Sequence, residues 1–160
     1  MTQKGVSKKP EKEAQSTGLF HVIDPQVFQR PLLDELCDLA TRVRAIAKRT
    51  EGARFLQSLL PTSRAMLYFT QPSTRTFLSF DNACHILGMS TSEIRNPATS
   101  SEVKGESFED GIRTFSSYVD VIVMRTQESG RAAQAAQLMD TIARPVPVIN
   151  AGSGSDQHPT

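Results

Sequence analysis

Residues 64–80 read "RAMLYFTQPSTRTFLSF", and the pattern of this stretch decides the fold. Residues 64–70 form a short apolar run with the length and composition of a buried strand. A polar loop follows, and the chain then has a helical pattern as far as Gly88, a residue type that commonly ends helices. The stretch therefore predicts a buried strand, a polar loop and a helix in direct succession.

The same alternation repeats along the rest of the chain. Further strands are predicted at residues 89–94, 120–125 and 146–152, and further helices at residues 106–119 and 129–142. Strands that alternate with helices at this spacing are typical of parallel sheets. We therefore predict an α/β fold in which a parallel sheet is flanked by helices on both faces.

The N-terminal part divides into a tail and a helix. Residues 1–18 hold four Lys and no large apolar residue except Met1 and Val6, so they cannot bury enough surface to offset the entropy of ordering. We predict a disordered tail over residues 1–18 and one domain over residues 19–160. An amphipathic helix is predicted to begin at Pro31 and to end near Gly52.

Composition excludes several classes of function. A net charge of +1 gives no reason to expect a nucleic-acid partner, and no apolar run approaches the length of a membrane span. Cys37 and Cys84 are far apart and have no Cys or His at metal-binding spacing, which favours reduced thiols and argues against a metal site. We expect a soluble, cytoplasmic protein.

The candidate site is predicted at one edge of the sheet. Ligands of open α/β sheets bind beyond the carboxyl ends of the strands. Three polar groups are predicted at that edge: residues 71–76, which follow the first strand, Arg125, which closes the third, and residues 150–160 at the end of the fourth. Free backbone amides at a helix start attract anions, and the hydroxyls and the guanidinium of Arg75 would add donors. The alternative, a helix cap with an exposed Arg, stays open from the residues alone.

Two further polar residues have both a functional and a structural interpretation. His158 could donate a hydrogen bond to a polarised carbonyl, with Asp156 to orient it, or it could be merely exposed. Lys104 could reach a phosphate as a mobile cation, or it could belong to a flexible linker. His21 and His85 have no comparable neighbours, and no nucleotide-binding glycine motif occurs.

Three segments together resemble the carbamoyltransferase family. They are residues 69–88 ("FTQPSTRTFLSFDNACHILG"), residues 100–125 ("SSEVKGESFEDGIRTFSSYVDVIVMR") and residues 146–160 ("VPVINAGSGSDQHPT"). The resemblance runs from about residue 19 to residue 160, with the motifs in the family's order. The second and third segments are more similar to the aspartate branch of the family than to the ornithine branch.

The resemblance implies a reaction and a set of site residues. The carbamoyl group of carbamoyl phosphate would pass to the amine of L-aspartate, giving N-carbamoyl-L-aspartate and phosphate in de novo pyrimidine biosynthesis. Four residues would hold the phosphate, namely Ser73, Thr74, Arg75 and Thr76. Thr76, Arg125 and His158 would also direct donors at the carbonyl oxygen and form the catalytic set. The resemblance implies neither a metal nor a cofactor.

The resemblance also implies a homotrimer with sites at subunit interfaces. Ser100 and Lys104 would reach into the neighbouring subunit's site, and regulatory or dihydroorotase subunits stay open as partners. The family has two domains, and this chain covers only the carbamoyl phosphate domain, ending one residue before the Gln that usually follows HPT. We interpret the chain as a fragment that by itself binds carbamoyl phosphate weakly without turnover.

Three residues depart from the family pattern. Gln71 stands where Glu usually precedes PSTRT, Phe77 stands where Arg is common, and Thr126 stands where His is usual. Phe77 removes a cation near the phosphate, unless the family's Arg mainly braces a helix or an interface. Two alternatives therefore stay open: a non-catalytic structural or regulatory relative, and a carbamoyltransferase for another amine.

Overall fold

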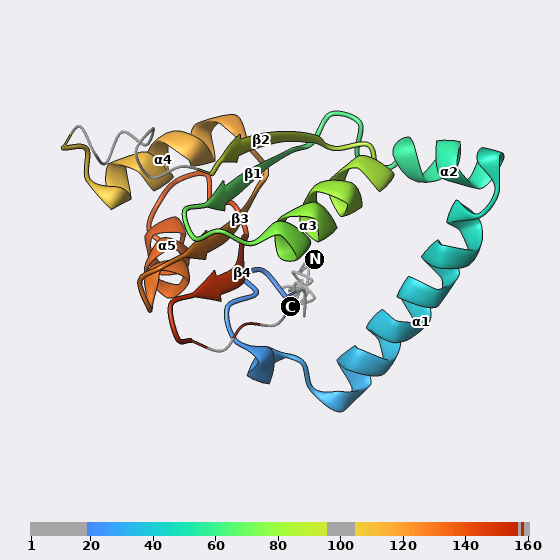
Figure 1. Ribbon diagram of the computed structural model, residues 1–160, viewed down its shortest axis with the longest axis horizontal. Helices are drawn as coiled ribbons and strands as arrows, with labels where there is room; N and C mark the ends of the chain where they lie inside the picture. The colour runs from blue at the N-terminus through green and yellow to red at the C-terminus, as the bar shows by residue number, and fades with distance from the viewer. Residues whose placement is uncertain (1–18, 96–104, 157, 159–160) are drawn as a thin grey trace, which may run out of the picture.

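A four-stranded parallel sheet lies at the centre of the molecule (Figure 1). The computed structural model describes residues 19–95, 105–156 and 158. The strands are β1 (Arg64–Phe69), β2 (Ser90–Ile94), β3 (Val121–Thr126) and β4 (Val148–Ser153), in the order β2-β1-β3-β4. Each lies within two residues of its predicted bounds, so the predicted parallel sheet is confirmed.

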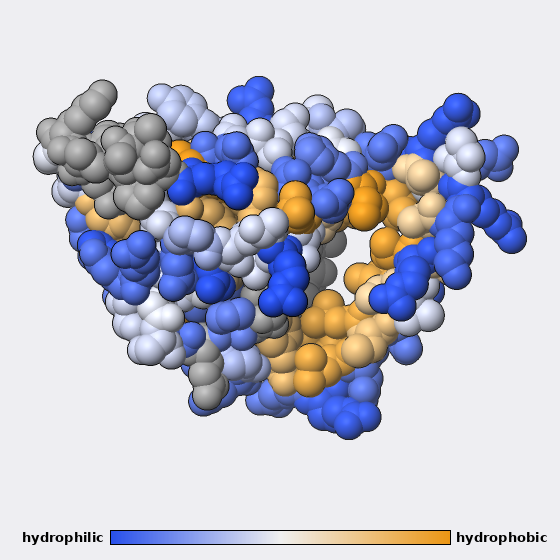
Figure 2. Space-filling model, viewed as in Figure 1, coloured by the Kyte–Doolittle hydropathy of each residue, from blue (hydrophilic) through white to orange (hydrophobic). Residues whose placement is uncertain are grey.

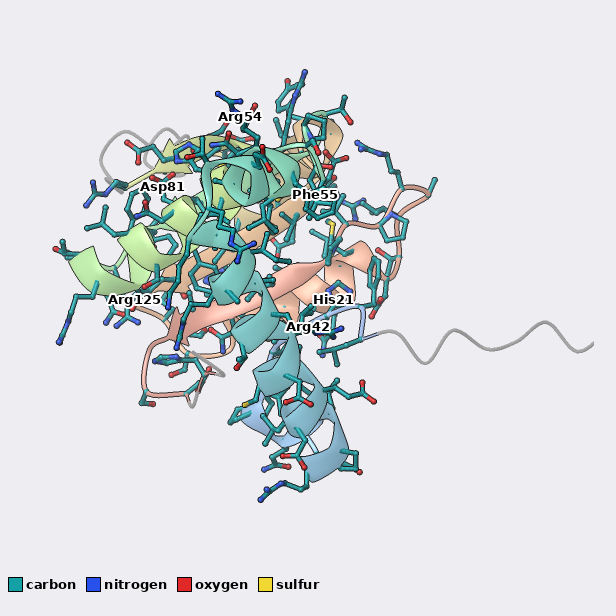
Figure 3. All side chains as sticks on the ribbon, turned by 90° about the vertical axis from the view of Figure 1, so that its right-hand side faces the viewer. His21, Arg42, Arg54, Phe55, Asp81 and Arg125 are labelled. Atoms are coloured by element: carbon teal, nitrogen blue, oxygen red, sulfur yellow. The ribbon has the colours of Figure 1, made fainter. Side chains whose placement is uncertain are left out.

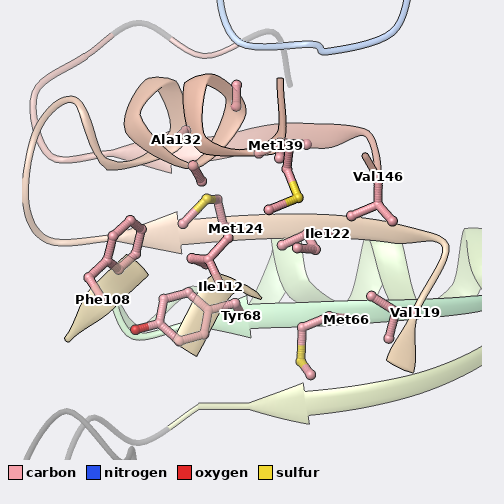
Figure 4. Close-up of a cluster of buried hydrophobic side chains, with 13 residues drawn as sticks. Met66, Tyr68, Phe108, Ile112, Val119, Ile122, Met124, Ala132, Met139 and Val146 are labelled. Carbon is pink, nitrogen blue, oxygen red and sulfur yellow. The ribbon is translucent and has the colours of Figure 1, made fainter. Parts of the chain in front are cut away.

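Helices cover both faces of the sheet, as predicted. Helix α3 (Thr74–Ile86) packs on one face, and α4 (Phe108–Tyr118) and α5 (Arg131–Met139) pack on the other. Side chains of β1 alternate between the two faces of the sheet. Met66 and Tyr68 belong to the larger apolar cluster, which lies under α4 and α5 and is shown in Figure 4. Leu67 and Phe69 belong to the smaller cluster under α3. Burial on both faces explains why β1 reads as a continuous apolar run.

The strand order creates an opening beside β1. After β1 the chain crosses through α3 to β2 on one side, and it later returns through α4 to β3 on the other side. Loops that leave two adjacent parallel strands in opposite directions separate at the carboxyl ends of those strands, which is where such sheets bind ligands. Because Phe69 pairs with Arg125, this switch point lies where the polar residues were predicted.

The segment before the first helices is attached to β4. The backbone of Val22 accepts from the N–H of Asn150 at 2.8 Å and donates to the carbonyl of Val148 at 2.9 Å. His21 Nδ1 accepts from the N–H of Val148 at 3.0 Å, and a short 3₁₀ helix, η1 (Pro25–Val27), follows. This segment therefore extends the sheet beyond β4. The predicted tail, residues 1–18, lies outside the described residues.

The structure corrects the predicted end of the first helix. Helix α1 (Arg30–Ala47) stops before Gly52, and Gly52 lies inside a second helix, α2 (Thr50–Gln57), which the sequence analysis missed. A Cβ at Gly52 would lie 2.1 Å from the carbonyl oxygen of Ile46. Gly52 therefore permits the close approach of α2 to the last turn of α1, and it does not end a helix.

The apolar side of α1 is not covered by the described part of the chain. Leu33, Leu36 and Leu39 are between 40 and 49% exposed, and no residue of α1 is buried. Figure 2 shows apolar side chains along the inner side of the α1 and α2 arm, beside an opening between the arm and the rest of the molecule. None of the described helices combines the length and the apolarity needed to cross a membrane.

Candidate anion site at the carboxyl edge of the sheet

The loop between β1 and α3 is attached to the end of β3. The N–H groups of Thr70 and Gln71 both donate to the carbonyl oxygen of Arg125, at 2.9 and 3.3 Å. Ser73 then takes an extended conformation, and α3 begins at Thr74. The predicted polar group at residues 73–76 and the backbone of Arg125 are therefore brought together by pairing across the switch point.

The start of α3 has free donors. Ser73 occupies the N-cap position, but its side chain makes no capping hydrogen bond. Within the described part of the chain, the side chains of Ser73, Thr74, Arg75 and Thr76 form no ion pair and no cap. The first backbone amides of a helix lack partners inside the helix, and the helix dipole places partial positive charge there. This arrangement favours an anion over a simple cap.

Arg125 contributes a partly buried guanidinium to the same edge. Its side chain leaves β3 on the side of the sheet where α3 lies (Figure 3), and its Nη1 donates to the carbonyl of Ala151 at 2.7 Å. Nε is buried and has no hydrogen-bond partner among the described residues. Buried donors are rarely left unpaired in proteins, so this group is a candidate donor to a bound ligand.

Gly152 allows Arg125 to lie against β4. Its φ angle is +131°, and a Cβ there would lie 2.4 Å from Nη1 of Arg125. Side chains larger than hydrogen are disfavoured at this φ, and any Cβ would displace the guanidinium. The glycine of the NAG sequence at residues 150–152 is therefore explained by the position of Arg125.

The loop after β4 places His158 near the end of the described chain, where its side chain is half-buried. Asp156, predicted as a residue that could orient His158, accepts from the backbone N–H of Gly130 at 2.5 Å. Ser155 and Ser129 are also hydrogen-bonded to each other. These contacts join the loop after β4 to the loop after β3. Ser100 and Lys104 lie outside the described residues.

Two of the three departures from the family pattern are packed into the domain. Phe77 is 5% exposed and contacts Phe69 edge to face, with ring centroids 5.3 Å apart. Thr126 leaves β3 on the face opposite to Arg125, and its hydroxyl donates to the carbonyl of Glu128 at 3.0 Å. Phe77 therefore packs between α3 and the sheet, and Thr126 stabilises the turn after β3.

Separate hollows flank the switch point on the two faces of the sheet. The hollow on the α3 side has a volume of about 320 Å³, and it is lined by Phe69, Gln71, Pro72, Ser73, Thr74 and Arg95. The one on the other side is about 120 Å³, and its lining includes Arg131, which pairs with Glu128 and has its guanidinium carbon 4.5 Å from the centroid of the Phe108 ring. The α3-side pocket contains the predicted phosphate-binding residues Ser73 and Thr74.

Arg95 is a residue of this edge that the sequence analysis missed. It directly follows β2, just as the loop residues 70–73 directly follow β1. The rule that ligands bind beyond the carboxyl ends of parallel strands applies to it equally, so the signal was present in the sequence. Only the strand order shows that the end of β2 lies next to the start of α3.

Buried Cys84 has a structural role. It lies on α3, and burial, followed by the negative charge of Asp81, raises the pKa of its thiol. A raised pKa keeps the group as an inert neutral thiol. Among the described residues, no group of three His, Cys, Asp or Glu side chains is close enough to hold a metal ion.

Comparison with known proteins places the chain in a family. Residues 21–160 match the family of the carbamoyl-P binding domain of aspartate/ornithine carbamoyltransferase. The chain belongs to the aspartate/ornithine carbamoyltransferase family. The resemblance seen in the sequence motifs is thereby confirmed, and the parallel sheet with its β1–α3 loop is the carbamoyl phosphate domain of that family.

Relatives in this family are named as the aspartate enzyme. The chain is 41% identical over 140 residues to an aspartate carbamoyltransferase catalytic subunit of Methanocella arvoryzae and 39% identical over 150 residues to a chloroplastic aspartate carbamoyltransferase of Arabidopsis thaliana. These matches cover 88% and 93% of this chain but 42% and 36% of the relatives. The chain thus spans about two fifths of the length of the relatives it matches.

Solved structures of aspartate transcarbamoylases share the fold of this chain. Aspartate transcarbamoylase of Trypanosoma cruzi, in complex with carbamoyl aspartate and phosphate, matches with a TM-score of 0.78 and 29% identity, over 96% of this chain and 46% of that one. The catalytic subunit of the M. jannaschii enzyme matches with a TM-score of 0.73 and 34% identity, over 88% and 43% of the two chains.

Proposed function

We propose that this chain binds carbamoyl phosphate and forms the carbamoyl phosphate domain of an aspartate carbamoyltransferase. Two observations at the same edge of the sheet carry the proposal, in a domain that belongs to this family: the uncapped start of α3, and the buried Nε of Arg125, which has no partner among the described residues. The names of the relatives favour aspartate over ornithine as the acceptor. The complete enzyme would make N-carbamoyl-L-aspartate and phosphate for de novo pyrimidine biosynthesis.

The residues divide between the two ends of carbamoyl phosphate. Ser73, Thr74 and Arg75 would hold the phosphate with hydroxyl, amide and guanidinium donors, as suits a doubly charged group at a helix start. Thr76, Arg125 and His158 would donate to the carbonyl oxygen. Arg125 supports this assignment best, since its Nε is a buried donor without a partner among the described residues.

The reaction requires that charge on the carbonyl oxygen be stabilised. The amine of aspartate attacks the carbonyl carbon, a C–N bond forms, and negative charge develops on the oxygen. The C–O bond to phosphate then breaks, phosphate leaves with the electron pair of that bond, and the departing phosphate takes the proton that the amine loses. Donors fixed before the reaction stabilise this charge without having to reorganise, which makes them effective. The bond of Arg125 to Ala151 would hold its guanidinium in this way.

The proposal extends to assembly. In a homotrimer, Ser100 and Lys104 would act in the neighbouring subunit's site, and the acceptor amino acid would be bound largely by residues outside these 160. We propose a cytoplasmic location from the two unpaired cysteines, although several relatives bear chloroplastic names. Fractionation with tagged protein would test the location, and light scattering would test the trimer.

A transfer assay tests the function. The protein, expressed as encoded from start to stop codon, is given carbamoyl phosphate with either aspartate or ornithine. We expect transfer to aspartate, and Arg75→Ala should lower kcat/KM at least about a hundredfold because a charge-assisted bidentate contact is lost. Arg54→Ala, which removes an exposed Arg of α2, is the matched control and should leave the rate unchanged.

The other outcomes distinguish the alternatives. Binding of carbamoyl phosphate with transfer to neither amino acid would indicate a carbamoyltransferase for another amine. A folded protein that binds neither carbamoyl phosphate nor phosphate would contradict the proposal and support a structural or regulatory relative.

A further inference from the structure

Arg95 extends from the end of β2 toward the start of α3. Thr91 of β2 points toward α3, because its hydroxyl donates to Asp81 of that helix at 3.0 Å. Side chains of a strand alternate between its faces, so Arg95, four residues later, leaves on the same side. Its guanidinium carbon lies 4.3 Å from the centroid of the Phe77 ring.

The contact with Phe77 places a cation beside the predicted phosphate site. Phe77 belongs to the first turn of α3, where its N–H donates to the carbonyl of Ser73. Arg95 also lines the same pocket as Ser73 and Thr74, on the α3 side of the sheet. The guanidinium therefore contacts a side chain of the first turn of α3 and faces the same pocket as the start of that helix.

No carboxylate of the described residues forms an ion pair with Arg95. The Arg95 side chain is exposed. Asp81 of α3 accepts a hydrogen bond from Thr91 and lies beside the imidazole of His85. Glu93, two residues before Arg95 on β2, has an exposed side chain. A cation next to the positive end of a helix is unfavourable without an anion between them. A bound phosphate would remove that repulsion.

We propose that Arg95 is a further phosphate-binding residue of this site, held in position by the ring of Phe77. The inference rests on the proposed function, because the phosphate is taken to be that of carbamoyl phosphate. In this chain the cation comes from the end of β2, and Phe77 provides a buried ring that packs on Phe69 and supports the guanidinium.

The test measures binding of inorganic phosphate and of carbamoyl phosphate by calorimetry, using the protein as encoded. Arg95→Gln should weaken both about tenfold, as expected for loss of one cation near a dianion in a partly solvated pocket. The affinity of this variant should also depend less on salt. Arg95→Lys should keep part of the affinity, and Arg54→Gln on α2 should keep all of it.

A second variant tests the role of the ring. Phe77→Leu keeps an apolar side chain in the cluster but removes the aromatic face, so phosphate binding should weaken about threefold with Arg95 intact. In the Arg95→Gln background the same change should have no further effect on binding. KM for carbamoyl phosphate should rise in parallel, with kcat nearly constant.

The outcomes separate this inference from the proposed function. If Arg95→Gln binds phosphate as tightly as the unchanged protein while Arg75→Ala does not, Arg95 has no part in the site and the inference is wrong. Weaker binding with an unchanged salt dependence would assign Arg95 a structural role and would also overturn it. Failure of the unchanged protein to bind either compound would overturn both proposals.

Discussion

Replacement of Gly152 by Ala should damage both the fold and the anion site. The residue has a φ angle of +131°, which a side chain with a Cβ disfavours. The new methyl group would lie 2.4 Å from Nη1 and 2.9 Å from Cζ of Arg125, so the guanidinium must leave its present position. Its hydrogen bond to the carbonyl of Ala151 would then be lost.

The size of the effect follows from these two contributions. Backbone strain at such a position costs about 1–3 kcal/mol. Loss of a hydrogen bond from a charged donor adds roughly 1.5–3 kcal/mol. The free energy of unfolding should therefore fall by about 2.5–6 kcal/mol, which lowers Tm by roughly 5–24 °C in a domain of this size. Affinity for carbamoyl phosphate should fall at least about tenfold.

Gly130→Ala is the matched control for this substitution. Gly130 also has a positive φ angle, +79°, but a Cβ there would have no heavy atom within 4 Å. Thermal denaturation and phosphate calorimetry on both variants separate strain from displacement of Arg125. We expect Gly130→Ala to lose stability alone. The reasoning would be refuted if Gly152→Ala kept the phosphate affinity of the unchanged protein, or if both variants lost affinity equally.

Three further predictions concern buried contacts. Phe77→Arg should lower the free energy of unfolding by at least about 3 kcal/mol, because it places a charge in an apolar cluster next to Arg95. Urea denaturation measures this loss, and Arg95→Gln should relieve part of it. His21→Ala should cost about 1–3 kcal/mol because the N–H of Val148 loses its acceptor, and an unchanged melting curve would contradict this. Cys37 should react readily with a thiol reagent and Cys84 slowly. Burial raises the pKa of Cys84 in the folded protein above that of the unfolded thiol. The stability that the neutral Cys84 thiol contributes should therefore be fully present below the pKa of the unfolded thiol and be lost as pH rises through the folded pKa. Cys84→Ala should not show this loss.

Local pattern was sufficient for the sheet and for most of its helices. The strands β1, β3 and β4 each have a short run of apolar residues, and the helices α3, α4 and α5 have apolar faces that the sheet buries, so the spacing of apolar residues predicts which side chains are buried. Strand β2 is polar except for Ile94. Helix α2 was missed because it is only eight residues long and includes Gly52, a residue type that usually ends helices. Its position depends on contact with α1, which no local pattern shows.

The sequence by itself determined which polar groups lie at or beyond the carboxyl ends of the strands, because these groups directly follow or close the predicted strands along the chain. Only the tertiary structure decided which of them meet. Pairing of Phe69 with Arg125, of His21 with Val148 and of Arg95 with Phe77 joins residues 18 to 127 positions apart. These contacts depend on the strand order β2-β1-β3-β4, which is set by packing of the whole domain and leaves no signal in the spacing of residues along the chain.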